Sequence, residues 1–204
     1  MTTRIVAISG GLSDASSSTL LAGRITAALG QRLGADLSVE TVELRPLAHE
    51  IIDASITGFA APLLQHVHDQ LREADALVVV TPIYKASYPG LFKAFFDALD
   101  QDLLIGKPVL IAATGGTARH SLAIDFALRP LFAYLQTVPV PTGIFASPHD
   151  WGSDGAGALT SRVERAVDEL VSLLGGGGTG RTYSDDIDLF SETMLSISDP
   201  HRPE

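Results

Sequence analysis

Three short apolar runs, far apart in the chain, constrain the fold more than any other feature. They are Ile5 to Ile8, Ala76 to Val80 and Val109 to Ala113. None of them alternates apolar with polar residues, which is typical of strands buried on both faces of a parallel sheet. Each run is followed by a loop and then by a segment with helical spacing of its apolar residues. The chain therefore predicts strands that alternate with helices, in an α/β fold with a doubly wound parallel sheet.

Periodicity along the whole chain predicts five strands and five helices. The strands span residues 4–9, 37–42, 76–80, 107–113 and 138–146, and the helices span residues 19–29, 61–72, 91–100, 122–135 and 160–174. The second strand alternates and the last contains Pro139 and Pro141, so both are expected at edges of the sheet. Residues 43–58 show no clear period and are expected to form a long connection. Pro130 predicts a kink or local rearrangement in the fourth helix.

A chain of 204 residues is expected to form one domain, followed by a further segment. We assign residues 1–175 to the domain, because the run of glycines from Gly175 to Gly178 breaks the chain. Residues 176–204 read as a glycine-rich linker and an acidic C-terminal tail, with a short apolar island. An oligomer or partner contact and disorder are equally open alternatives for this tail.

Composition excludes several classes of protein. No apolar run approaches the roughly 18 residues that a membrane span needs, so no membrane association is expected. The chain has no cysteine, which excludes a disulfide framework and thiolate zinc sites. Without the pattern of a secretory signal, cytoplasmic localisation is the simplest expectation. A net charge of -10 with only 14 scattered basic residues argues against nucleic acid as a partner. The six histidines are not spaced for a metal site.

Hydroxyl side chains cluster where the first strand passes into the first helix, at Ser9, Ser13, Ser16, Ser17, Ser18 and Thr19. A helix N-terminus offers unsatisfied N–H groups and the positive end of the helix dipole, which together bind phosphate. We therefore expect this loop to hold a phosphate monoester. The alternative is that one serine is an N-cap and the others are ordinary loop residues.

Two further loops follow the other buried strands. The residues expected to frame a flat ring are Pro82, Ile83, Tyr84 and Lys85, and those expected to border it are Thr114, Gly115, Gly116 and Thr117. Glycine lets a backbone approach a planar ligand closely, and a tyrosine offers a flat amphipathic surface. Packing of the aromatic side chain and a tight turn without a ligand are the alternatives. Since parallel strands end at one edge of a sheet, the three loops are expected to converge.

The absence of two common nucleotide-binding motifs argues against two classes of nucleotide site. It has neither the Gly-x-Gly-x-x-Gly fingerprint of dinucleotide sites nor the Gly-x-x-x-x-Gly-Lys loop of nucleoside triphosphatases. No nucleophile elbow or paired-carboxylate motif stands out. A mononucleotide such as flavin mononucleotide (FMN), at the switch point beside the first strand, is favoured.

The motifs at residues 81–93, 106–109 and 113–120, together with residues 127–130, resemble those of the NAD(P)H-dependent FMN reductases. The resemblance runs from about residue 4 to residue 174. It implies a flavodoxin-like, three-layer α/β/α fold with five parallel strands in the order 2-1-3-4-5. It also implies FMN as substrate or loosely held cofactor, NAD(P)H as hydride donor, and a homodimer or homotetramer. The loop from Ser9 to Thr19 departs from many relatives in having no arginine, and Phe126 stands where many have tyrosine.

The activity implied by this resemblance is the transfer of hydride from nicotinamide to FMN, with no catalytic acid or base required. The subgroup that it looks most like supplies reduced flavin to a luciferase-like monooxygenase. One alternative is a quinone or azo reductase of the same fold that keeps its FMN. The other is a non-catalytic flavin carrier or interaction module.

Overall fold

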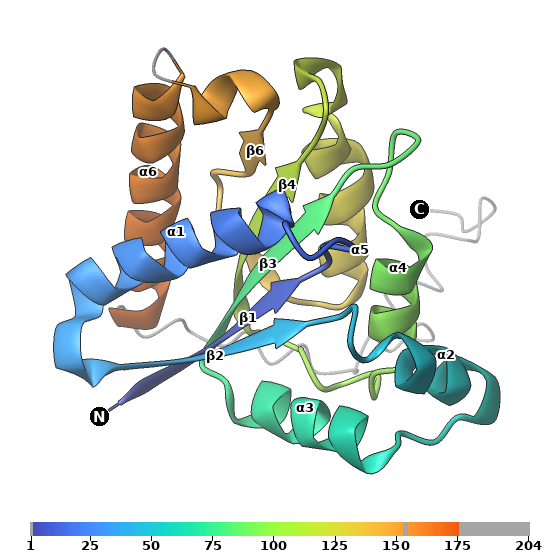
Figure 1. The fold of residues 1–204 in the computed structure, drawn as a ribbon. Helices are drawn as coiled ribbons and strands as arrows, with labels where there is room; N and C mark the ends of the chain where they lie inside the picture. The colour runs from blue at the N-terminus through green and yellow to red at the C-terminus, as the bar shows by residue number, and fades with distance from the viewer. Residues whose placement is uncertain (1, 153–154, 176–204) are drawn as a thin grey trace, which may run out of the picture.

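The computed structural model describes residues 2–152 and 155–175 (Figure 1). The strands are β1 (Thr3–Ser9), β2 (Leu37–Glu43), β3 (Ala76–Pro82), β4 (Pro108–Thr114), β5 (Val138–Pro139) and β6 (Ile144–Ala146). The α-helices are α1 (Ser17–Leu33), α2 (Ala48–Thr57), α3 (Pro62–Glu73), α4 (Gly90–Asp97), α5 (Arg129–Tyr134) and α6 (Ala156–Gly175). The predicted tail, residues 176–204, lies outside the described residues.

One parallel sheet with the order β2-β1-β3-β4-β5 forms the centre of the described structure. This confirms the predicted fold and strand order. The predicted continuous strand 138–146 is wrong in one respect, because it is divided into β5 and β6, which both pair with β4. Pro139 and Pro141 carry no N–H to donate to a ladder, and Thr142 N–H bonds the Glu169 carboxylate instead, at 2.7 Å.

Helices cover both faces of the sheet (Figure 1). Alternate residues of β1 face the two sides: Ile5 and Ala7 pack in the cluster with α1 and α6, and Val6 and Ile8 pack in the cluster with α2, α3, α4 and α5. Every residue of β3 is buried. Burial on both faces explains the uninterrupted apolar runs of the central strands, and the layers confirm the three-layer α/β/α architecture.

The helix α2 was not predicted. Its sequence carries only a weak signal, because Ile51 and Ala54 are buried while the equally apolar Ile52 and Ile56 are exposed. No side chain caps its start. Its place in the fold comes from contact with α4 and α3 rather than from its own periodicity.

Pro130 has the predicted effect on the fourth predicted helix. Residues Ile124–Leu128 form a π-helical segment, in which Arg129 N donates to Ile124 O, and α5 then begins with Pro130 in its first turn. A proline is tolerated there because its missing N–H would have no partner in the α-helix that it starts. Within the described residues, no helix is both long enough and apolar enough to cross a bilayer.

Candidate active site

The loops after β1, β3 and β4 lie at one edge of the sheet, because these strands are parallel neighbours (Figure 1). Ser9 pairs with Val80, and Pro82 pairs with Thr114. The ladder continues beyond the strand ends, since Ile83 N donates to Thr114 O at 2.7 Å. The convergence of the three loops predicted from the sequence is therefore present.

The first loop leads into α1, and a side chain caps the start of this helix. The Ser16 side chain is the N-cap of α1, and its Oγ accepts from Ser18 N at 3.2 Å and from Thr19 N at 3.3 Å. The N-cap alternative thus holds for Ser16. The amides of residues 11–17 donate no hydrogen bond to any acceptor among the described residues. Successive unpaired amides at a helix start form a positive concavity that suits an anion.

Buried hydroxyls link the first loop to the third. Thr114 Oγ1 lies 2.9 Å from Ser18 Oγ and accepts from Ser17 Oγ at 3.2 Å. Ser9 Oγ lies 3.0 Å from Thr19 Oγ1. Ser9 and Ser18 are fully buried and Thr114 is 2% exposed. These groups therefore hold the loops together, and their hydroxyls already have partners.

Among the six hydroxyl residues predicted to hold a phosphate, Ser13 and Ser17 are exposed to solvent. Gly11 lies against this cluster, because a Cβ built on it would lie 1.8 Å from Ser16 Oγ. Only glycine leaves room for the cap at this position. The outer part of the loop presents amides and the hydroxyls of Ser13 and Ser17, and the Ser17 hydroxyl donates to Thr114.

The loop after β3 is a tight two-residue turn. Tyr84 and Ser87 exchange both backbone hydrogen bonds, at 2.8 and 3.1 Å. Lys85 and Ala86 have φ angles of 52° and 71°, which L-residues other than asparagine and aspartate rarely adopt. Tyr84 is 49% exposed, whereas Ile83 belongs to the core. Pro82 is also buried, so the turn offers an exposed aromatic ring on a rigid base.

The two glycines after β4 differ in their surroundings. A Cβ on Gly115 would lie 2.7 Å from the Phe145 ring, whereas one on Gly116 would meet no atom within 4 Å. The Phe145 ring therefore lies close against Gly115, and Gly116 borders open space. Thr117 caps a short 3-10 helix, with its Oγ1 accepting from Arg119 N at 3.4 Å.

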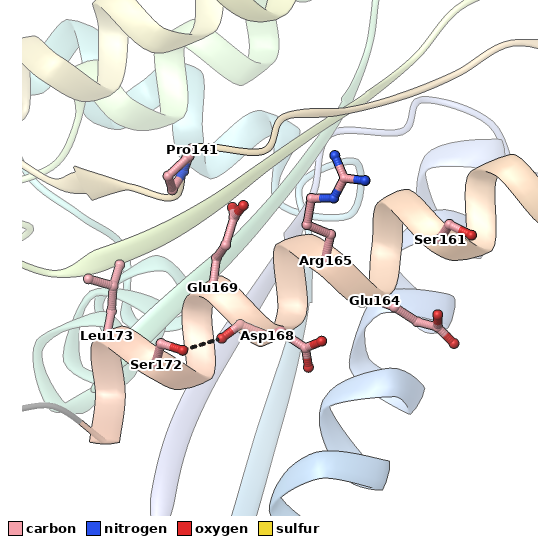
Figure 2. Close-up of a pocket in the computed structure, with 8 residues that line it drawn as sticks. All are labelled: Pro141, Ser161, Glu164, Arg165, Asp168, Glu169, Ser172 and Leu173. Carbon is pink, nitrogen blue, oxygen red and sulfur yellow. Dashed lines mark hydrogen bonds between the residues drawn. The ribbon is translucent and has the colours of Figure 1, made fainter.

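Two surface cavities of about 690 Å³ each lie outside these loops. One runs along α6 opposite Pro141, and its acidic side chains Glu164, Asp168 and Glu169 make it unsuited to a phosphate (Figure 2). The other begins at Ala118, beside the third loop. Neither cavity is lined by residues 10–17 or 83–87, so neither coincides with the predicted site.

The second cavity contains two ion pairs, Asp125 with Arg129 and Asp150 with Arg162. Burial raises the pKa of Asp150, but hydrogen bonds from Ser147 and Arg162 outweigh burial and leave that pKa below its ordinary value. Asp150 is thus a charged partner of Arg162. Within residues 2–152 and 155–175, no group of three or more acidic or histidine side chains is placed to hold a metal ion.

Comparison with known proteins decides the family. A family model described as NADPH-dependent FMN reductase matches residues 3–152. The chain belongs to this family. It is 40% identical to FMN reductase (NADPH) of Pseudomonas aeruginosa over 176 residues, 85% of this chain and 93% of that protein. It is 39% identical to NADH-dependent FMN reductase SfnE of Pseudomonas putida, over 84% of this chain and 92% of that protein.

A solved structure, an oxidoreductase from Corynebacterium diphtheriae, has a TM-score of 0.81 and 44% sequence identity. The match covers 85% of this chain and 97% of that one. These findings confirm the predicted family and the flavodoxin-like fold. The protein is an NAD(P)H-dependent oxidoreductase of the FMN reductase family, with FMN and NAD(P)H as its cofactor and hydride donor.

The residues at the sheet edge of this FMN reductase are chemically suited to FMN. The phosphate needs donors, and the amides of residues 11–17 are uncommitted among the described residues. The flavin ring needs a flat surface and room, and Tyr84 and Gly116 offer these on the neighbouring loops.

One side chain at this edge was missed from the sequence. Arg45 Nη1 donates to Asp14 Oδ1, which joins the segment after β2 to the first loop. The available signal was the strand order, because β2 is the neighbour of β1 and ends at the same edge. Arg45 follows the end of β2 by two residues, so this strand order places it near the first loop.

Proposed function

We propose that FMN binds across the carboxyl edge of β1, β3 and β4, with its phosphate at residues 11–17. The observation that carries this proposal is the row of amides without acceptors at the start of α1, beside the exposed hydroxyls of Ser13 and Ser17. We call residues 11–17 the phosphate seat. Its inner side is held by the hydrogen bonds of four hydroxyl residues, Ser9, Ser16, Ser18 and Thr19. The helix dipole adds a favourable potential for the anion.

The flavin ring lies, in this proposal, between the turn at residues 84–87 and the loop at residues 115–117. Pro82 and Ile83 fix the base of the turn, and Tyr84 and Lys85 supply its exposed surface. Gly116 allows the backbone to approach the ring, while Gly115 and Thr117 hold the shape of the loop. Thr114 connects this loop to the phosphate seat.

When bound, FMN supplies the chemistry by accepting a hydride from the nicotinamide of NAD(P)H. The protein's part is to hold the two rings in contact, to orient them and to limit access of water. Positioning of this kind requires no side-chain acid or base. The rigid turn and the closely packed loops are suited to it.

We propose that reduced FMN leaves the protein for a luciferase-like monooxygenase. We also propose that the chain forms a homodimer or homotetramer. Support for self-association comes from large apolar side chains on the surface after β4. Leu122 is 62% exposed, Phe126 79% and Tyr134 78%. Phe126 N donates to Leu122 O at 3.0 Å, which places these two side chains one helical turn apart on the same side. Neighbouring exposed apolar side chains are typical of an interaction face.

Steady-state oxidation of NADH and NADPH, with and without added FMN, tests the function. Oxidation that depends on added FMN is the expected result, because the flavin is proposed to exchange. A protein that co-purifies with stoichiometric flavin and turns over quinones readily would instead be a quinone or azo reductase. No oxidation of either nucleotide, even with FMN, would leave a flavin carrier and contradict the proposed function.

A further inference from the structure

The proposed phosphate seat has no cation of its own. Residues 9–19 contain no lysine or arginine, and the whole chain has a net charge of -10. A phosphate monoester brings close to two negative charges at neutral pH. Amides and the helix dipole offset only part of this charge, since the dipole is equivalent to roughly half an elementary charge. A cation from another element would complete the seat.

Arg45 is placed to be that cation. Leu44 N donates to Ser9 O at 3.0 Å, so the chain runs beside β1 for one residue beyond β2. This contact brings Arg45 to the carboxyl edge of the sheet, where its Nη1 donates to Asp14 Oδ1. Among the described residues, no other lysine or arginine side chain makes a hydrogen bond or ion pair with residues 10–17.

The ion pair between Arg45 and Asp14 is weakly held. The Asp14 side chain is 94% exposed and that of Arg45 is 45% exposed. Exposed pairs of this kind contribute roughly 0–1 kcal/mol, because water screens them and two side chains must be ordered. Within the described residues, only Nη1 of the guanidinium has a partner. The remaining N–H groups of its planar fork match the oxygens of a phosphate.

We propose that Arg45 binds the FMN phosphate and that Asp14 competes with the phosphate for Arg45. Asp14 also places a negative charge on the loop that receives the phosphate, which lowers the affinity further. The pair therefore keeps the flavin exchangeable, as a reductase that releases its product requires. This inference rests on the proposed function, because it takes FMN as the ligand and residues 11–17 as the seat.

Comparison of FMN with riboflavin isolates the phosphate, since riboflavin has the same ring and no phosphate. We would measure the Kd of both flavins by isothermal titration calorimetry at pH 7.5, for the wild-type protein and for Arg45→Ala and Asp14→Asn. Arg32→Ala is the matched control. Arg32 forms a similar exposed pair with Asp168, at 2.7 Å, in the last turn of α1. It lies about 22 Å along the helix axis from Ser17.

The expected result is a Kd for FMN raised roughly tenfold by Arg45→Ala, as expected for the loss of one charged hydrogen bond at an exposed site. Asp14→Asn lowers the Kd for FMN severalfold, and neither variant changes the Kd for riboflavin. Arg32→Ala changes neither Kd. Thermal unfolding of each variant verifies that the fold is intact.

Other results overturn the inference. If Arg45→Ala leaves FMN binding unchanged, or weakens FMN and riboflavin equally, Arg45 does not bind the phosphate. If Asp14→Asn weakens FMN binding, Asp14 assists rather than competes. In these cases the proposed function stands, because the wild-type protein still binds FMN. A wild-type protein that binds neither flavin overturns the proposed function and this inference together.

Discussion

Ser18 and Thr114, which are 96 residues apart in the chain, are joined by a buried hydrogen bond of 2.9 Å between their side-chain oxygens. The bond connects the first turn of α1 to the last residue of β4. It therefore sets the distance between the loop proposed for the phosphate and the loop proposed for the ring. Neither side chain has access to solvent that could replace the bond.

Thr114→Val tests this link, because valine keeps the shape of threonine and removes the hydroxyl. We expect a loss of about 1–3 kcal/mol in the free energy of unfolding, since Ser18 Oγ is left buried and unsatisfied. Urea denaturation measures it. The double variant with Ser18→Ala should lose less than the sum of the two single variants. Strict additivity would mean that the bond contributes nothing.

Replacement by alanine should lower stability at Gly115 and leave it nearly unchanged at Gly116. Gly115→Ala brings a Cβ to 2.7 Å from the Phe145 ring and should cost about 1–3 kcal/mol of stability. Gly116→Ala has open space and should change stability by less than about 0.5 kcal/mol. If the flavin ring lies there, Gly116→Ala still weakens FMN binding. Unchanged flavin affinity in a fluorescence titration would remove Gly116 from the site.

The turn after β3 is strained at Lys85 and Ala86, whose φ angles are positive. Replacing them by asparagine and glycine, the residues preferred in such turns, should raise the free energy of unfolding by about 1 kcal/mol. Ala27→Gly, on the exposed side of α1, is the control and should lower it by about 1 kcal/mol. A destabilised Lys85→Asn/Ala86→Gly variant in urea denaturation would show that the turn is not strained.

His68 should make the protein sensitive to acid. Its side chain is 4% exposed, and its Nε2 has no hydrogen-bond partner among the described residues. Burial lowers its pKa below the ordinary 6.5. As the pH falls below about 6.5, His68 is therefore protonated in the unfolded chain before it is protonated in the folded protein. The free energy of unfolding decreases as the pH falls through that range. The slope is at most about 1.4 kcal/mol per pH unit.

His68→Leu should remove this part of the acid sensitivity, as measured by urea denaturation at pH 7.5 and pH 5.5. His66→Leu is the control, because His66 lies on the same helix and is exposed. Equal pH dependence in the wild-type protein and His68→Leu would show that His68 is not the group responsible.

The fold could be predicted because its central strands are buried on both faces, which leaves an unmistakable apolar run in the sequence. The helix α2 could not, since its contacts with α3 and α4 bury only one narrow stripe. The position of the strand after α5 was predictable from Pro139 and Pro141, but its division into β5 and β6 depends on contacts such as that of Thr142 with Glu169.

The candidate site was predictable as a set of three loops, and less so residue by residue. A serine-rich sequence does not show which hydroxyl will cap the helix and which will face a distant strand. Ser18 is buried because Thr114 lies beside it, and Ser16 is the cap because Gly11 leaves it room. The predicted strand order brings Arg45 to the same edge as the first loop, but its contact with Asp14 depends on how that loop folds.

The position of FMN can be seen directly in a crystal structure of the protein with FMN bound. We expect the phosphate within hydrogen-bond distance of the amides of residues 11–17, with the ring between the turn at residues 84–87 and the loop at residues 115–117. A phosphate bound away from residues 11–17, for example in the cavity along α6, would contradict this expectation.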